Sequence, residues 1–198
     1  MSFDESAVAV PAAPPADRLE LTDPRAMRAL AHPTRLALLE HLHIGGSATA
    51  TQVASACGES PSACSYHLRA LARWGLVEEA PGGRGRERPW RLAAKSISFS
   101  STQGTAEQVA AASLLRRAVL DRDDRVLREF FEHEHDLPED WQEAATFGNG
   151  ALHLTLDELN ELSAQVSALL QSYHRPGTRP AGSRRVDLIF RALPKAGP

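Results

Sequence analysis

Residues 49–71, TATQVASACGESPSACSYHLRAL, predict two short helices joined by a tight turn. Thr49 and Gln52 have the spacing of a capping box, in which each side chain bonds the backbone N–H of the other residue. The first helix therefore begins directly after Thr49. Gly58 ends it, and Ser60 can cap the next helix. Two helices joined by so short a glycine-containing turn are typical of a helix-turn-helix, whose second helix enters the major groove of DNA.

The second helix, predicted over residues 60–74, has two distinct faces. Apolar residues at helical spacing predict its buried side, which consists of Cys64, Leu68, Leu71 and Trp74. The opposite side is polar and consists of Ser62, Ser65, Tyr66, Arg69 and Arg73. Small hydroxyl residues permit close approach to a groove floor, and arginine can bind guanine through two hydrogen bonds. Considered alone, however, this helix is better explained as an ordinary amphipathic helix with a solvated polar face.

A basic hairpin follows the helix and favours the DNA interpretation. Residues 76–80 and 88–92 predict two strands, with the glycine-rich turn 81–87 between them. Residues 84–95 hold five cations and one acid, a local balance of +4 in a chain of net charge −3. Such a hairpin can hold phosphates across the minor groove, whereas the alternative is a solubilising loop. The predicted phosphate contacts of this basic wing, residues 81–91, are Arg84, Arg86 and Arg88.

Two more helices are predicted upstream, at residues 24–31 and 33–42, each with a proline at its start. With them, residues 23–95 resemble the ArsR-type winged-helix transcriptional regulators. The matching motifs are LAHPTR at 30–35, LLEHL at 38–42, VA at 53–54, SPSACSYHLRAL at 60–71, GLV at 75–77 and the wing. The resemblance implies a sequence-specific DNA-binding repressor, usually a homodimer and often released from DNA by an effector.

The cysteines depart from the pattern of the family's metal sensors. The resemblance places the sensors' Cys-x-Cys pair at Thr49 and Thr51, which supply no thiolates. Cys57 and Cys64 stand instead at apolar helix positions, so they are predicted to be small core residues rather than metal or redox sites. Two cysteines in 198 residues and no secretory signal indicate a reducing, cytoplasmic location.

Histidines are the other candidate metal ligands. Residues 133–136, His-Glu-His-Asp, resemble a ligand cluster, but residues two apart on a helix point to different faces, and zinc needs about four converging ligands. No metal site is therefore predicted, although a second subunit could complete one. His32 and His67 match the family motif, and His67 is included among the predicted DNA-binding residues. It could touch a phosphate or cap a buried polar contact, and the sequence does not choose.

Composition and motifs restrict the function classes. The chain contains no motif of a serine hydrolase, zinc protease, phosphate-binding loop or dinucleotide-binding fold, so no enzyme activity and no cofactor are predicted. No apolar run approaches the length of a membrane span. With 42% apolar residues, 198 residues suffice for two small modules.

The predicted modules are a disordered N-terminal tail (1–20), a winged helix-turn-helix DNA-binding domain (21–98) and a dimerisation or effector domain (105–198). A Ser/Thr/Gly linker, 96–104, would separate the last two. Thr105 and Gln108 form a capping box for a helix of ~45 Å that runs toward Glu134. Its apolar stripe consists of Val109, Ala112, Leu115, Val119, Val126 and Phe130, widened by Leu127 and Phe131. We expect this stripe to meet another subunit or the DNA-binding module.

The C-terminal module is predicted to be α+β. Thr155 and Glu158 cap another helix, and residues 147–154 and 186–192 predict strands that could pair with each other. Residues 121–161 hold thirteen acids and three arginines, a balance of −10, so this region should face away from DNA. Dimerisation, ligand sensing or both remain open as its role.

The sequence therefore predicts a mainly α fold with a small β wing. The predicted function is a non-enzymatic, dimeric regulator of transcription that binds double-stranded DNA. A repressor is favoured over an activator. Its effector, if any, is unknown. Two alternatives remain: a metal-responsive repressor with histidine and carboxylate ligands, and a winged helix that serves as a protein-interaction module.

Overall fold

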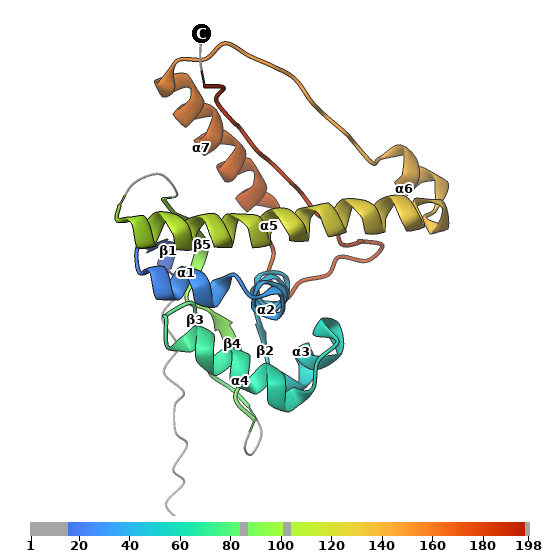
Figure 1. Cartoon of the computed structure of the whole chain (residues 1–198). Coiled ribbons are helices and arrows are strands. Elements are labelled where there is room, and N and C mark those ends of the chain that lie inside the picture. Colours follow the sequence, from blue (N-terminus) through green and yellow to red (C-terminus); the bar gives the residue numbers. More distant parts are fainter. Residues whose placement is uncertain (1–15, 84–86, 101–103, 197–198) are drawn as a thin grey trace, which may run out of the picture. The chain divides into compact units, whose positions relative to one another are not determined.

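The computed structural model describes residues 16–83, 87–100 and 104–196 (Figure 1). The chain forms two compact units. The N-terminal unit runs to Leu120 and includes 176–178, and the remaining residues form the C-terminal unit. The division falls inside α5 (Ala106–His133), whereas the sequence places it between residues 98 and 105.

The helices predicted for the N-terminal unit are present. They are α1 (Pro24–Leu30), α2 (Pro33–Gly45), α3 (Ala50–Cys57) and α4 (Pro61–Ala72). Each begins at a side chain that accepts a hydrogen bond from a backbone N–H two or three residues further on, because the first N–H groups of a helix lack partners. These caps are Asp23, His32, Thr49 and Ser60.

The turn between α3 and α4 is built as the sequence predicts. Thr49 N donates to Gln52 Oε1 at 2.8 Å and Gln52 N donates to Thr49 Oγ1 at 3.3 Å, which confirms the capping box. Gly58 ends α3 at φ 64°, in the left-handed conformation that side chains with a Cβ avoid. Ser60 Oγ then accepts from Ala63 N and starts α4.

A small antiparallel sheet follows the helix pair. Its strands are β2 (Ser47–Ala48), β3 (Val77–Glu79) and β4 (Trp90–Leu92), in the order β2–β4–β3. The β3–β4 hairpin is the predicted wing, with Glu79 opposite Trp90. β2 is not predictable from the sequence, because two residues are too few to show an alternating pattern. This sheet and the helices confirm a mainly α fold with a winged helix-turn-helix.

A second sheet corrects two sequence expectations. β1 (Ala16–Leu21) and β5 (Ala94–Phe99) pair in parallel, so residues 16–20 are not part of a disordered tail and residues 96–99 are not a linker. Both strands pack apolar side chains against the core, among them Leu21, Leu19, Ile97 and Phe99. Residues 1–15 lie outside the described part of the chain.

The first half of α5 belongs to the core of the N-terminal unit. Thr105 and Gln108 form the predicted capping box, with hydrogen bonds of 2.8 and 3.2 Å. Ala111, Ala112 and Leu115 are buried in the same apolar cluster as the core residues of α1 to α4. This half of the predicted apolar stripe is therefore covered within the chain.

The C-terminal unit contains the second half of α5, a 3-10 turn (Glu134–Asp136), α6 (Glu139–Glu143) and α7 (Leu156–Tyr173). Thr155 and Glu158 cap α7 as predicted. Residues 147–154 and 186–192 form no strand, so their expected pairing is wrong. Instead the two segments bind α5. Phe147 stacks on Phe131 with ring centroids 5.3 Å apart, and Arg191 bonds Asp123.

No helix within the described ranges combines the length and hydropathy of a membrane span.

Candidate nucleic-acid interface

Helix α4 presents a polar face to solvent and an apolar face to the core. Cys64, Leu68 and Leu71 are fully buried, and Trp74 packs partly buried just beyond the helix. The predicted contact residues lie on the opposite side: Ser62, Tyr66, Arg69 and Arg73 are exposed or half-buried, and so is Ser65. Spacings of three, four and seven residues place them along one helix face. The predicted division of the helix is thus present.

The N-terminal end of α4 is lined with hydroxyl groups. Ser60 and Ser62 form a hydrogen bond between their Oγ atoms at 3.0 Å. Tyr66 is 60% exposed, and its ring meets the edge of the His67 ring with centroids 5.4 Å apart. These short side chains leave room for close approach of a duplex, while Tyr66 projects from the same face.

The cations of α4 and of the wing differ in their partners. Neither Arg69 nor Arg73 forms a side-chain hydrogen bond or ion pair with any described residue. In the wing, by contrast, Arg88 bonds Glu79 at 3.1 Å and Arg91 bonds Glu78, both across the β3–β4 hairpin. Arg69 and Arg73 are therefore available to an anionic ligand without the loss of an existing ion pair.

The hairpin is less cationic than its tip alone indicates. The net charge of residues 76–95 is only +2, because this stretch also contains Glu78 and Glu79 on β3 and Glu87 in the turn. The balance of +4 holds only for residues 84–95, which do not include the two acids of β3. Arg84 and Arg86, two of the predicted phosphate contacts, lie outside the described residues. Arg88 is described and exposed.

The His67 side chain points toward α2 and does not lie on the solvent-exposed face of α4. Its Nδ1 accepts a hydrogen bond from Arg35 Nε at 3.3 Å, and its ring lies 4.7 Å from that of His32. Arginine always carries its protons, so His67 must be neutral to accept this bond. Burial lowers the pKa of His67, and the neighbouring His32 and Arg35 lower it further. Between the two options that the sequence leaves open, the structure favours the buried polar contact.

Arg35 connects three helices around this histidine. Its Nη1 donates to the Ala29 carbonyl at the end of α1 at 2.6 Å, while its Nε reaches His67 on α4. A second polar link joins the start of α2 to the turn before α4, because Thr34 Oγ1 donates to Glu59 Oε1 at 3.1 Å. These contacts orient α4 from the side that packs against α2, away from its exposed polar face. Sequence reasoning misses them, since nothing in residues 32–36 shows which distant side chain they contact.

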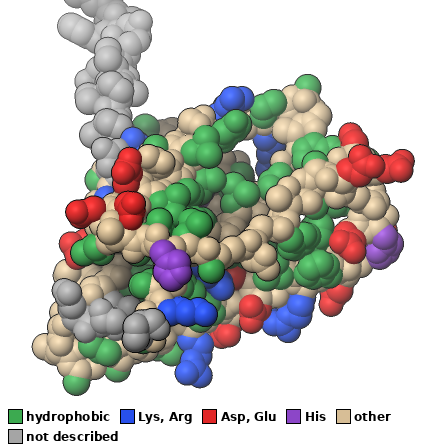
Figure 2. All heavy atoms as spheres, turned by 90° about the horizontal axis from the view of Figure 1, so that it is seen from above, with side chains coloured by type: hydrophobic (Ala, Val, Ile, Leu, Met, Phe, Trp, Pro, Cys, Tyr) green, Lys and Arg blue, Asp and Glu red, His purple; other side chains and the backbone are tan. Residues whose placement is uncertain are grey.

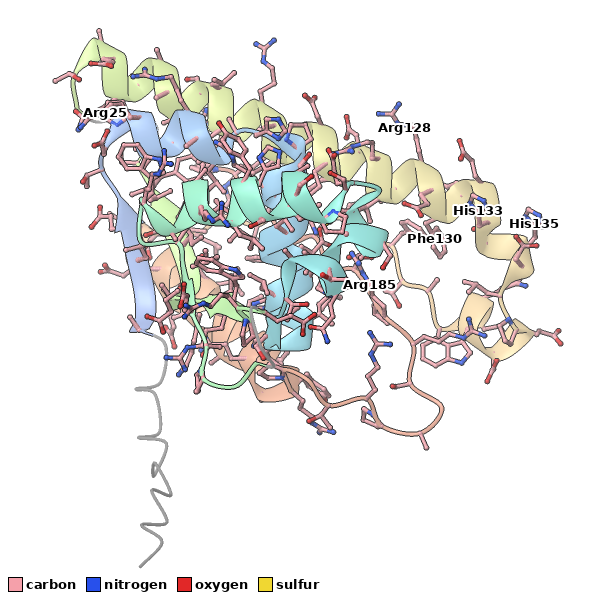
Figure 3. The ribbon with its side chains drawn as sticks, turned by 90° about the horizontal axis from the view of Figure 1, so that it is seen from below. Arg25, Arg128, Phe130, His133, His135 and Arg185 are labelled. Atoms are coloured by element: carbon pink, nitrogen blue, oxygen red, sulfur yellow. The ribbon has the colours of Figure 1, made fainter. Side chains whose placement is uncertain are left out.

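Trp74 closes the other end of α4. The guanidinium of Arg25, at the start of α1, lies 5.6 Å from the Trp74 ring centroid (Figure 3). Gly75 follows at φ 66° and turns the chain into β3. Stacking of a cation on an indole ring stabilises partly exposed sites by ~0.5–1 kcal/mol.

The cysteines behave as core residues. Cys64 is fully buried and Cys57 is partly buried. Burial raises the pKa of the Cys57 thiol to about 11 and also raises that of Cys64. Because the thiolate is the species that binds metals and reacts, both groups are held in their inert form.

The His-Glu-His-Asp run does not converge on a centre. His133 Nδ1 bonds the Glu129 carbonyl oxygen at 2.9 Å, within α5, and His135 lies 3.6 Å from Asp136 (Figure 3). In the described part of the chain, no three His, Cys, Asp or Glu side chains are grouped to hold a metal ion.

Comparison with known families agrees with this geometry. Residues 30–80 match the model of a helix-turn-helix domain. This chain therefore carries a helix-turn-helix domain over these residues. The match spans the end of α1, all of α2 to α4, and β3, which are the elements that build and orient the polar face of α4. In a DNA-binding helix-turn-helix, the second helix of the pair, here α4, enters the major groove.

Solved structures similar to this chain include two possible regulators of transcription and a complex with an oligodeoxyribonucleotide. A possible transcriptional regulatory protein from Mycobacterium bovis (fragment 1–100) is 26% identical over 50% of this chain and 88% of its own, with a TM-score of 0.33. A possible transcriptional regulator for arsenical resistance is 28% identical over 52% and 94%, with a TM-score of 0.31. A mutant of S. aureus MepR bound to an oligodeoxyribonucleotide is 15% identical over 75% and 86%, with a TM-score of 0.27. No curated protein matches the chain. Since these TM-scores are below 0.5, the assignment rests on the domain match.

Proposed function

We propose that this helix-turn-helix protein is a homodimeric, non-enzymatic repressor that binds a specific operator through α4 and the basic wing. One observation carries the proposal. The second helix of the helix-turn-helix, α4, has an exposed polar face, on which Arg69 and Arg73 have no partner among the described residues. A cation without an intramolecular partner can bind a base or a phosphate without first breaking an ion pair.

The residues of this face have different expected roles. Ser62, Ser65 and Tyr66 approach base edges and flanking phosphates, because their hydroxyl groups can form hydrogen bonds with both. Arg69, at the middle of the face, binds guanine through two hydrogen bonds. Arg73, at the end of the helix, binds a phosphate.

The wing and His67 act around that face. Arg84, Arg86 and Arg88 hold the DNA backbone without reading bases. His67 has a positioning role, because the hydrogen bond that it accepts from Arg35 holds α4 against α2. We therefore assign it no direct contact with DNA.

The proposed dimer follows from the geometry of operators. Helix-turn-helix dimers bind half-sites about 34–36 Å apart, which requires a fixed distance between two recognition helices. The covered half of the α5 stripe is not available for this contact. Leu120, Leu127 and Phe131 share another face of α5 and are 39%, 39% and 55% exposed. We propose that this face meets its counterpart in a second copy.

Two measurements test the proposal. Selection of bound duplexes from a random pool by the full-length protein should enrich one two-half-site sequence. Titrations of that duplex at several salt concentrations should then give a steep fall of affinity with salt, since each neutralised phosphate contributes a slope of ~0.9 in log–log units.

A matched control variant tests whether the exposed face of α4 is the surface that binds DNA. Arg175→Ala removes an exposed cation that follows α7, outside the proposed DNA interface and the proposed dimer face, and should leave affinity and slope unchanged. The double variant Arg69→Ala/Arg73→Ala should lose most specific binding. A protein that enriches no sequence and shows no salt-dependent binding would refute the DNA role and favour a protein-interaction module.

A further inference from the structure

Residues 186–192, VDLIFRA, have the pattern of a strand without a strand partner among the described residues. Figure 1 draws this stretch, in dark red near the C-terminus, as an extended segment. Its backbone N–H and C=O groups form no backbone hydrogen bond with any described residue. Open backbone groups on an extended segment are a template for pairing with another strand.

The same segment exposes an apolar face. Val186, Leu188 and Phe190 alternate along it and are 61%, 67% and 49% exposed. Residues two apart share a face of an extended chain, so these side chains line up. Figure 2 shows apolar side chains, in green, open on the surface of the molecule. Among the described residues of the C-terminal unit, Asp123 is buried but no apolar side chain is. A surface of this kind is typical of an interaction site.

The charges of the segment indicate which partner fits it. Asp187 and Arg191 stand two residues before and two residues after Ile189. When a second copy lies antiparallel with Ile189 opposite Ile189, each Asp187 therefore faces an Arg191, and the pair occurs twice by symmetry. The segment is complementary to itself in this register.

Neighbouring registers lack this match. Centring the pair on Leu188 places Arg185 opposite Arg191, which puts like charges together. Centring it on Phe190 places Asp187 opposite Leu193 and leaves the carboxylate without a cation across the pair. In the Ile189 register, by contrast, the opposite face carries only apolar residues from both copies.

Contacts within the C-terminal unit hold the segment in place. Arg191 Nη2 bonds Asp123 Oδ2, and Asp123 also accepts from Arg122 Nη1 at 3.1 Å. Because Asp123 is shared between two guanidinium groups, Arg191 can also bind the Asp187 carboxylate of a second copy. Anchoring on α5 also reduces the entropy lost when the segment pairs.

We propose that residues 186–192 pair with the same residues of a second copy, antiparallel and centred on Ile189. This pairing rests on the proposed homodimer and adds a contact separate from the α5 face. Two strands alone are marginally stable in water, so the pairing strengthens a dimer that other surfaces also hold.

Cysteine cross-linking of the full-length protein tests the register. Ile189→Cys should form a disulfide-linked dimer under mild oxidation, because directly opposed Cα atoms lie ~4.5–5.5 Å apart, within the range of a disulfide. Val186→Cys is the matched control: in this register the two Val186 positions are ~20 Å apart, so it should remain unlinked. The wild-type protein, oxidised in parallel, shows whether Cys57 or Cys64 forms a disulfide between subunits.

A charge variant gives a second measurement. Asp187→Arg should raise the dimer dissociation constant about tenfold in sedimentation, since two symmetry-related attractions become repulsions. Arg185→Ala removes the 2.7 Å bond between Arg185 and Asp187 within the chain and should leave dimerisation unchanged.

The outcomes separate the two proposals. A dimer in which Ile189→Cys does not cross-link, or in which Val186→Cys links equally well, overturns the strand pairing and leaves the homodimer intact. A change of dimerisation in Arg185→Ala equal to that in Asp187→Arg also overturns it. A wild-type protein that sediments as a monomer and binds single half-sites overturns the homodimer itself.

Discussion

Substitution of Arg69 by alanine tests the proposed base contact directly. The side chain is exposed and has no partner among the described residues, so its removal breaks no interaction with them. Arginine and alanine are both good helix formers, and α4 should remain folded. Any loss of affinity can therefore be assigned to the contact with DNA.

The expected loss follows from the geometry of a bidentate contact. An arginine that binds guanine through two hydrogen bonds contributes ~1–3 kcal/mol of discrimination, which corresponds to a factor of about 5 to 150 in affinity. Arg69→Ala should lose this factor for each half-site of the selected operator and much less on a scrambled duplex. Preference should also relax at a single base pair in each half-site.

Fluorescence anisotropy with labelled operator and scrambled duplexes, at three or more salt concentrations, measures both quantities. Arg73→Ala is the comparison, because the loss of a phosphate contact should weaken binding to all sequences alike and lower the salt slope by ~0.9 for each subunit. Circular dichroism confirms that each variant is folded. Equal losses of Arg69→Ala on operator and scrambled DNA would refute base reading and make Arg69 a second phosphate contact.

Three other predictions concern the wing, the core and the histidine behind α4. Arg84→Ala/Arg86→Ala should weaken all sequences alike and lower the salt slope by ~1–2, and an unchanged slope would remove the wing from the interface. Leu68→Ala should lower the free energy of unfolding by ~2–5 kcal/mol in urea titrations, since Leu68 is fully buried; a loss below ~1 kcal/mol would contradict that burial. Folding lowers the pKa of His67 below its unfolded value of about 6.5. The neutral histidine therefore contributes fully to the free energy of unfolding above pH 6.5, and this contribution is lost as the pH falls through the pKa of the folded state. His67→Gln should therefore flatten the acid side of the stability profile, and an identical profile would exclude this role.

Local signals in the sequence determine where most helices begin and end. A capping residue acts on a backbone N–H two or three residues away, as Thr49 and Ser60 do, so its effect does not depend on the rest of the fold. Gly58 similarly ends α3 through its own backbone conformation. The apolar spacing of α4 also predicts its two faces, because helical periodicity is contained within the helix itself.

Contacts between distant residues are decided only by the tertiary structure. β1 and β5 pair across almost eighty residues, and neither has a local signal that names the other. The bond from Arg35 to His67 and the burial of Leu115 in the N-terminal core arise in the same way. For residues 186–192 the sequence determines an alternating apolar pattern, whereas the bond of Arg191 to Asp123 on α5 is seen only in the folded chain. An alternating pattern specifies which side chains share a face, whereas only the folded chain supplies the surface or strand that covers them.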